Sequence, residues 1–159
     1  MAREVGLGEG AIRTVLSRLS GAGLIEVSRR GCRLTEEGRA LLASLRSRLV
    51  ELGPMVVRPI PAVGFAYLVR GAADKVRLGV EQRDEAVRAG AEGAMTLVFR
   101  EGKLVMPGVS EDVGRDYPEL WERLEEVGLG EGDVVVIAFA GDERRARYGA
   151  LAAALTLLE

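Results

Sequence analysis

The hydrophobic pattern of the first fifty residues predicts a helix, a two-stranded hairpin and a second helix. Apolar side chains recur at steps of three and four from Ile12 to Leu19, and Gly21 ends this stretch. Two short apolar runs, 24–27 and 32–34, then flank a basic turn, as in a β-hairpin. The expected order is therefore helix, hairpin, helix.

The second helix is predicted to begin after Thr35, whose hydroxyl can cap its first turn. Leucines repeat at alternating steps of three and four from Leu42 to Leu52. This stripe either packs on its own domain or pairs with a second copy in a short coiled coil. A glycine and a proline then stop the helix, so we place two domains at 1–53 and 54–159.

The pattern of residues 54–159 alternates strands and helices in the order β-α-β-β-α-β-α, with an extra strand near 56–58. This order favours an α+β fold, a two-layer sandwich with helices on one face of a mostly antiparallel sheet. The last helix is apolar all round from Ala150 to Leu158, which indicates burial against a second subunit or insertion within its own chain. The predicted strands are 65–69, 95–99, 104–106 and 134–139, and the predicted helices are 74–89, one around 120–127, and one from Asp142 onward.

The N-terminal pattern resembles the winged helix-turn-helix domains of archaeal and bacterial regulators. The resemblance rests on the segment 19–25, Leu-Ser-Gly-Ala-Gly-Leu-Ile, which is similar to the turn from a recognition helix into the wing. It implies double-stranded DNA as the partner, with the helix in a major groove and a homodimer on two half-sites. Such domains have two helices ahead of the recognition helix, whereas only residues 1–7 precede it here. Either the domain begins earlier or a partner chain supplies the packing, so we expect Ile12, Val15 and Leu16 to be partly uncovered.

The candidate DNA-contacting residues lie on the polar face of the first helix and on the hairpin. Helical winding puts small and hydroxyl residues opposite the apolar stripe, with arginines on the two flanks. Arginines in these places can reach phosphates or guanine edges. The alternative is that they only solvate a helix face and a turn. The predicted contacts are Gly10, Arg13, Thr14, Ser17, Arg18, Arg29, Arg30 and Arg33.

The charge distribution supports a polyanion-binding surface in the first third of the chain. Residues 1–50 contain nine arginines and five glutamates, a net charge of +4, and the whole chain carries −2, so the rest carries −6. Arginine outnumbers lysine twenty to two, a bias expected of a thermophile.

The second domain offers low-specificity candidates for ligand binding. Helical spacing aligns Arg83 with Val80 and Val87 on the face expected to cover the sheet, where a guanidinium needs an anionic partner. That partner is either an internal carboxylate, Asp112 or Asp116, or a ligand. Asp74 and Asp142 each lie between a predicted strand and the helix that follows it. We expect each carboxylate to cap its own helix, which would leave no free anion site there. The ligand candidates are Asp74, Gln82, Arg83, Pro107 and Asp142.

Composition excludes several classes of protein. Histidine is absent and Cys32 is the single cysteine, so zinc spacings and intrachain disulfides are excluded. There is no P-loop and no dinucleotide fingerprint. We therefore expect no enzyme activity, no metal and no cofactor. The chain shows no leader or membrane span, which makes a cytoplasmic protein the default expectation.

The segments 79–84, 96–108 and 148–154 resemble an archaeal family in which a winged helix precedes a domain of unknown function. The resemblance implies a second domain similar to the small insert domain of some aminoacyl-tRNA synthetases and amidotransferases, and it implies no activity. We predict a DNA-binding transcriptional regulator whose second domain senses a small-molecule effector or a partner. The alternatives are an RNA-binding or translation-associated module, and a small enzyme of unknown chemistry.

Overall fold

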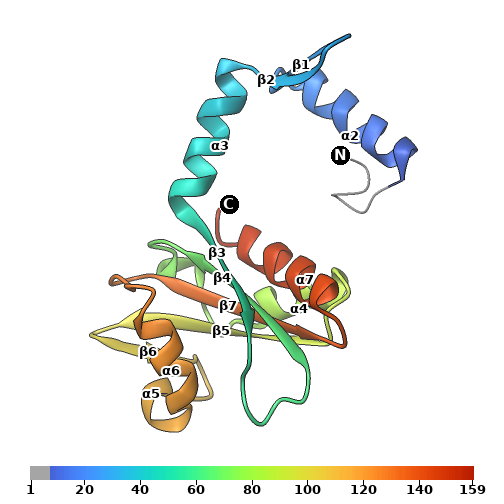
Figure 1. Ribbon diagram of the computed structural model, residues 1–159. Coiled ribbons are helices and arrows are strands. Elements are labelled where there is room, and N and C mark those ends of the chain that lie inside the picture. The colour runs from blue at the N-terminus through green and yellow to red at the C-terminus, as the bar shows by residue number, and fades with distance from the viewer. Residues whose placement is uncertain (1–7) are drawn as a thin grey trace. The chain divides into compact units, whose positions relative to one another are not determined.

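The computed structural model describes residues 8–159, and the chain divides into two units, Met1–Arg46 and Ser47–Glu159. Figure 1 shows a first unit built from helices and a hairpin, and a second unit built on a larger sheet. The division falls after Arg46, not at residue 53 as the glycine and proline had indicated. The next residues belong to the sheet of the second unit.

The first unit contains α2 (Glu9–Gly21), β1 (Ile25–Ser28), β2 (Gly31–Leu34) and the start of α3 (Glu36–Arg48). The hairpin pairs Ile25 with Leu34 and Ser28 with Gly31. Thr35 accepts a hydrogen bond from the Gly38 amide at 3.0 Å, so it caps α3 as expected. The predicted order of helix, hairpin and helix is confirmed.

The predicted leucine stripe is wrong beyond Leu45, because α3 ends at Arg48 and the chain continues as strand β3 (Leu49–Met55). Leu49 pairs with Val69 of the neighbouring strand. Sheet hydrogen bonds and burial of alternate side chains therefore override the helical spacing of the last leucines. The extra strand expected near 56–58 lies at 49–55 instead.

The second unit contains a five-stranded antiparallel sheet in the order β3-β4-β7-β5-β6. The central strand β7 is buried along its whole length and pairs with β4 on one side and β5 on the other. Four strands agree with the sequence-based expectation. Their bounds are β4 (Val63–Val69), β5 (Gly93–Arg100), β6 (Lys103–Val105) and β7 (Val134–Ala140).

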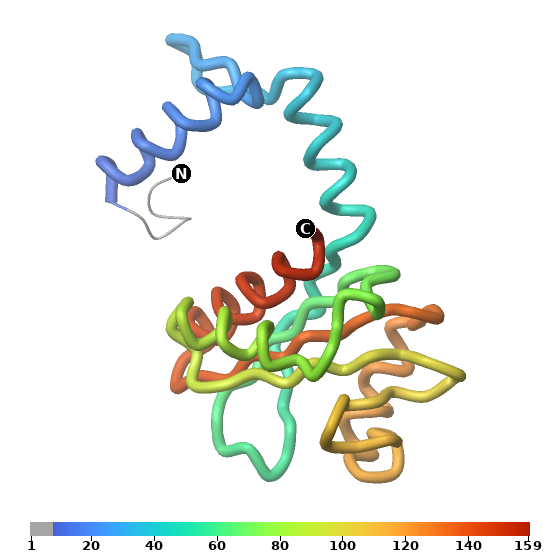
Figure 2. The backbone as a smooth tube through the Cα atoms, turned by 180° about the vertical axis from the view of Figure 1, so that it is seen from behind, coloured from blue at the N-terminus to red at the C-terminus, as the bar shows by residue number. Residues whose placement is uncertain are grey.

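Helices cover both faces of this sheet, which corrects the expected two-layer arrangement. One face packs against α4 (Val80–Arg88) and α7 (Glu143–Leu155), and the other against α5 (Val113–Asp116) and α6 (Pro118–Glu125). Figures 1 and 2 show the two helical layers on opposite sides of the strands. The reason is that β7 is apolar at every position, so neither of its faces can be left to water.

The last helix is inserted within its own unit, on the sheet and beside α4. A Cβ atom on Gly149 would lie 2.5 Å from the Cβ of Ala91, so glycine permits the close approach of this helix. Ala150, Ala153 and Leu157 are fully buried, whereas Leu155 remains 43% exposed. Among the helices of residues 8–159, none is long and apolar enough to cross a membrane.

Candidate nucleic-acid interface

Helix α2 presents its residues to solvent on nearly every side. The described chain buries none of them; Ile12, Leu16 and Leu19 are half-buried, and Val15 is 43% exposed. The expectation that this apolar stripe would be partly uncovered is confirmed.

The opposite face of α2 carries the residues predicted to meet DNA, and all of them are exposed. The Thr14 hydroxyl donates a hydrogen bond to the Gly10 carbonyl at 3.1 Å, a contact within the helix. Arg13, Ser17 and Arg18 extend the same exposed surface. On this face, two guanidinium groups therefore flank a row of small and hydroxyl residues.

The β1–β2 turn holds the second group of predicted contacts. The Ser28 hydroxyl donates to the Gly31 carbonyl at 3.1 Å and accepts from the Arg30 amide at 3.2 Å, which closes the turn. Arg29 and Arg30 stand exposed on it. Arg33 differs, because it faces Glu26 across the hairpin.

The Nε of Arg33 donates to Glu26 Oε2 at 2.7 Å, and both side chains are largely exposed. The charge of Arg33 is therefore partly compensated within the hairpin. No carboxylate in the part of the chain that the structure describes pairs with Arg13, Arg18 or Arg29, and the same holds for Arg30.

Most basic residues of the second unit have a carboxylate partner, unlike the arginines of α2 and of the β1–β2 turn. Arg70 forms the least exposed pair, with Nη1 2.6 Å from Asp133 Oδ2 and the Asp133 side chain 5% exposed. The other paired basic residues are Arg58, Arg83, Arg88, Lys103, Arg115, Arg145 and Arg147.

The ligand role of Arg83 was predicted because its helix face was expected to cover the sheet, and the structure contradicts that expectation. Its side chain is 53% exposed and bonds to the adjacent Asp84 at 3.0 Å. The buried residues of α4 are Gln82 and Ala86. The predicted face was wrong because Val80 and Val87, which share it with Arg83, are themselves 40% and 48% exposed, and α4 packs through its other face.

The other ligand candidates are dispersed over the second unit. Asp74 lies exposed in a short 3-10 turn, Ala73–Lys75, and does not cap α4 as predicted. Asp142 does cap α7, because its carboxylate accepts from the Arg145 amide at 3.0 Å. Pro107 precedes Gly108, the residue that lies against the Leu78 side chain just ahead of α4.

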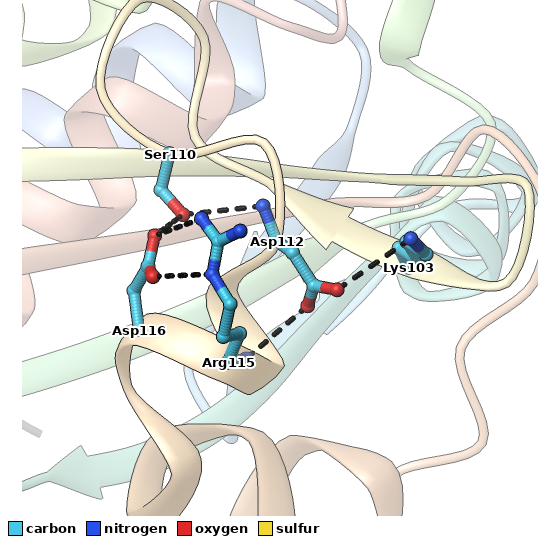
Figure 3. A network of polar contacts seen from close by, with 5 residues as sticks. All are labelled: Lys103, Ser110, Asp112, Arg115 and Asp116. Atoms are coloured by element: carbon cyan, nitrogen blue, oxygen red, sulfur yellow. Dashed lines mark hydrogen bonds and ion pairs between the residues drawn. The ribbon is translucent and has the colours of Figure 1, made fainter.

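A polar network joins the loop after β6 to α5 (Figure 3). The Ser110 hydroxyl donates to Asp116 Oδ2 at 2.6 Å, and Arg115 Nε donates to Asp116 Oδ1 at 2.9 Å. These two hydrogen bonds, that of Arg115 first, lower the pKa of Asp116. Lys103 pairs with Asp112, whose carboxylate also accepts from the Arg115 amide as the cap of α5. Each group therefore has a partner, and the network holds the loop in place.

The fold defines a class of mixed α+β proteins, in which an antiparallel sheet is covered on both faces and preceded by a small helical unit. Residues 61–157 match a domain of unknown function, DUF4443, and the chain belongs to this family.

The structure is also similar to that of a hypothetical protein from Pyrococcus horikoshii OT3. The TM-score is 0.70 at 30% sequence identity, over 98% of this chain and 80% of that chain. This similarity agrees with the archaeal family that the sequence resembles. A search of curated proteins finds no match.

Proposed function

We propose that this protein is a transcriptional regulator that binds double-stranded DNA through its first unit. In this proposal the first unit is a winged helix-turn-helix, with α2 as the recognition helix and the β1–β2 hairpin as the wing. The observation that carries the proposal is the set of exposed arginines, Arg13, Arg18, Arg29 and Arg30, that lack carboxylate partners within the described residues.

Unpaired guanidinium groups favour a phosphate partner for a physical reason. A cation already held by a carboxylate gains little from a phosphate, whereas a free one replaces condensed counterions on the duplex and gains their release. Gly10 and Ser17 lie between the two arginines of α2 and let the helix axis approach the bases. Arg33, paired with Glu26, is a weaker phosphate ligand in this scheme.

We assign the second unit a sensing role and not a catalytic one. Its less exposed carboxylates are each engaged by a basic side chain: Asp133 by Arg70, Asp112 by Lys103 and Asp116 by Arg115. Carboxylates held in this way are poor general bases. The regulator is proposed to act in the cytoplasm as a homodimer, which places two α2 helices on two half-sites.

The test is salt-titrated binding of the full chain to duplex DNA, structured RNA and heparin. We expect the duplex to bind most tightly and the logarithm of affinity to fall linearly with the logarithm of salt. Changing Arg13, Arg29 and Arg30 together to alanine lowers that slope by about 3 and the affinity by more than about tenfold.

The matched control changes three exposed arginines of the second unit, Arg83, Arg88 and Arg145, to alanine. It removes the same charge and is expected to leave duplex binding near that of the unchanged protein. Equal losses in both triple variants would reject a specific interface. A preference for structured RNA would instead support a translation-associated module.

A further inference from the structure

Helix α4 carries a stripe of four exposed side chains on its outer side. The stripe consists of Val80, Arg83, Asp84 and Val87. At 100° per residue, these four positions fall within about 100° of the helix circumference, so they form one face. The buried residues of the helix, Gln82 and Ala86, lie on the other side. The outer face therefore combines two apolar ends with a charged centre.

This stripe is symmetric about the midpoint between residues 83 and 84. A second α4 can pack against the first in the antiparallel direction, around a two-fold axis through that midpoint. Val80 of each copy then lies level with Val87 of the other copy, and Arg83 lies level with Asp84. A two-fold interface uses the same surface twice, so it has to be self-complementary in this way. The face of α4 meets this requirement in both shape and charge.

The flank of the same face adds a second complementary pair of charges. Glu81 and Arg88 are exposed and lie seven residues apart on one flank of the helix. In the antiparallel pair, Glu81 of one copy comes within about 3 Å, along the axis, of the level of Arg88 of the other. Arg88 also pairs with Glu85 of its own helix. A parallel pair would instead bring like charges together, which disfavours that arrangement.

The central charges keep their own pairing in such a dimer. Arg83 Nη2 lies 3.0 Å from Asp84 Oδ1 of the same chain, and both side chains are half exposed. Across the axis, two such pairs form a group of four alternating charges, in which each guanidinium gains a second carboxylate. Exposed charges of this kind contribute mainly orientation, whereas burial of the valines supplies most of the attraction.

We propose that this face of α4 is the surface through which two copies of the chain form a two-fold dimer. The inference rests on the homodimer of the proposed function and names its contact surface. Further apolar surface adjoins the stripe, because Leu78 and Val109 are exposed. The two residues are close, since a Cβ on Gly108 would lie 3.7 Å from Leu78 Cδ2.

The size of the stripe determines how strong the dimer is. Helix α4 has nine residues and is about 13 Å long. Its face is smaller than the about 800 Å² per partner of a standard stable interface. We therefore expect a weak dimer that forms at high protein concentration. Two adjacent half-sites on DNA would raise the effective concentration of the copies and favour the same contact.

The experiment measures the dimer dissociation constant of the full chain by sedimentation equilibrium, without DNA. Arg83→Glu places four carboxylates around the axis, and Asp84→Arg places four guanidinium groups there. Each reversal is expected to raise the dissociation constant at least about tenfold. An equimolar mixture of the two variants opposes acidic with basic side chains, so it dimerises about as tightly as the unchanged protein. This recovery also shows that both variants are folded.

Two further variants test the apolar ends and the specificity. Val87→Ser changes the interface twice, once in each copy, and is expected to raise the dissociation constant about tenfold. The matched control is Arg123→Glu in α6, which reverses an exposed arginine beside an acidic neighbour on the opposite face of the sheet. It is expected to leave dimerisation unchanged.

Three results would overturn the proposal: a protein that stays monomeric at the highest concentration, charge reversals without effect, or a mixture that stays monomeric. A dimer that neither reversal weakens has its contact elsewhere, which leaves the homodimer of the proposed function standing. Duplex binding is measured separately, so failure of the α4 surface and failure of the regulator proposal are distinguishable.

Discussion

The two units of this protein differ in the ion pairing of their arginines and in the burial of their apolar side chains. In the second unit most basic residues pair with carboxylates, and apolar side chains form two cores on opposite faces of one sheet. In the described part of the first unit, Ile25 is the single buried apolar side chain, and the exposed Arg13, Arg18, Arg29 and Arg30 have no carboxylate partner. Most charged and apolar side chains of the second unit therefore have partners within that unit, whereas the first unit keeps unpaired positive charge and half-buried apolar side chains at its surface.

The largest effect on stability is expected from a comparison of two leucine-to-alanine substitutions, one in each unit. Leu124 is fully buried against the sheet and Leu16 is half-buried on α2. We expect Leu124→Ala to lower the free energy of unfolding by about 2–5 kcal/mol, and Leu16→Ala by about 1 kcal/mol or less. Denaturant titration followed by Trp121 fluorescence reports on the second unit, and amide exchange in α3 reports on the first. Equal losses would show that the stripe of α2 is covered.

The next test compares two ion pairs. Asp133 is buried and accepts from Arg70 Nη1 at 2.6 Å, from the Gly71 amide at 3.0 Å and from the Gly130 amide at 2.9 Å. Asp133→Ala leaves these donors unpaired and is expected to lower the free energy of unfolding by about 2–4 kcal/mol. Glu26→Ala breaks an exposed pair and changes it by less than about 1 kcal/mol. Thermal unfolding of both variants measures the difference, and similar effects would contradict the contrast.

The smallest effect concerns acid stability. Tyr67 donates to Glu51 Oε2 at 2.7 Å and Arg147 donates to the same atom at 2.9 Å. The Tyr67 hydrogen bond is the larger cause that lowers the pKa of Glu51 below its ordinary value of 4.5. The stability from this ionised carboxylate is present above that value and is lost as the pH falls through the lowered pKa.

Glu51→Gln removes this titration. Because Glu51 is partly exposed, we expect a difference of only a few tenths of a kcal/mol, seen as a shallower loss of melting temperature below about pH 4.5 in the variant. Identical pH profiles would show that the carboxylate contributes nothing to folding.

Local pattern predicted the elements whose residues contact mainly their neighbours in sequence. The hairpin of residues 25–34, the Thr35 cap and the Asp142 cap follow from turn and capping chemistry. The strand Val134–Ala140 could be predicted from its apolar composition alone. The exposed positions of Arg13 and Arg29 also agree with helical winding and turn chemistry.

Tertiary contacts decided the features that pattern missed. Leu49 has helical spacing and lies in a strand, because it pairs with Val69. Arg83 aligns with Val80 and Val87 and is exposed, because α4 packs through Gln82 and Ala86 instead.

The sequence by itself determined the α+β class, the alternation of strands and helices, and the concentration of positive charge in the first third of the chain. These depend on side-chain chemistry, periodicity and turn residues, which act over a few positions. Only the tertiary structure decided that helices cover both faces of the sheet and which arginines have carboxylate partners. Those features depend on distances between residues far apart in the chain, and such distances exist only once the sheet has formed.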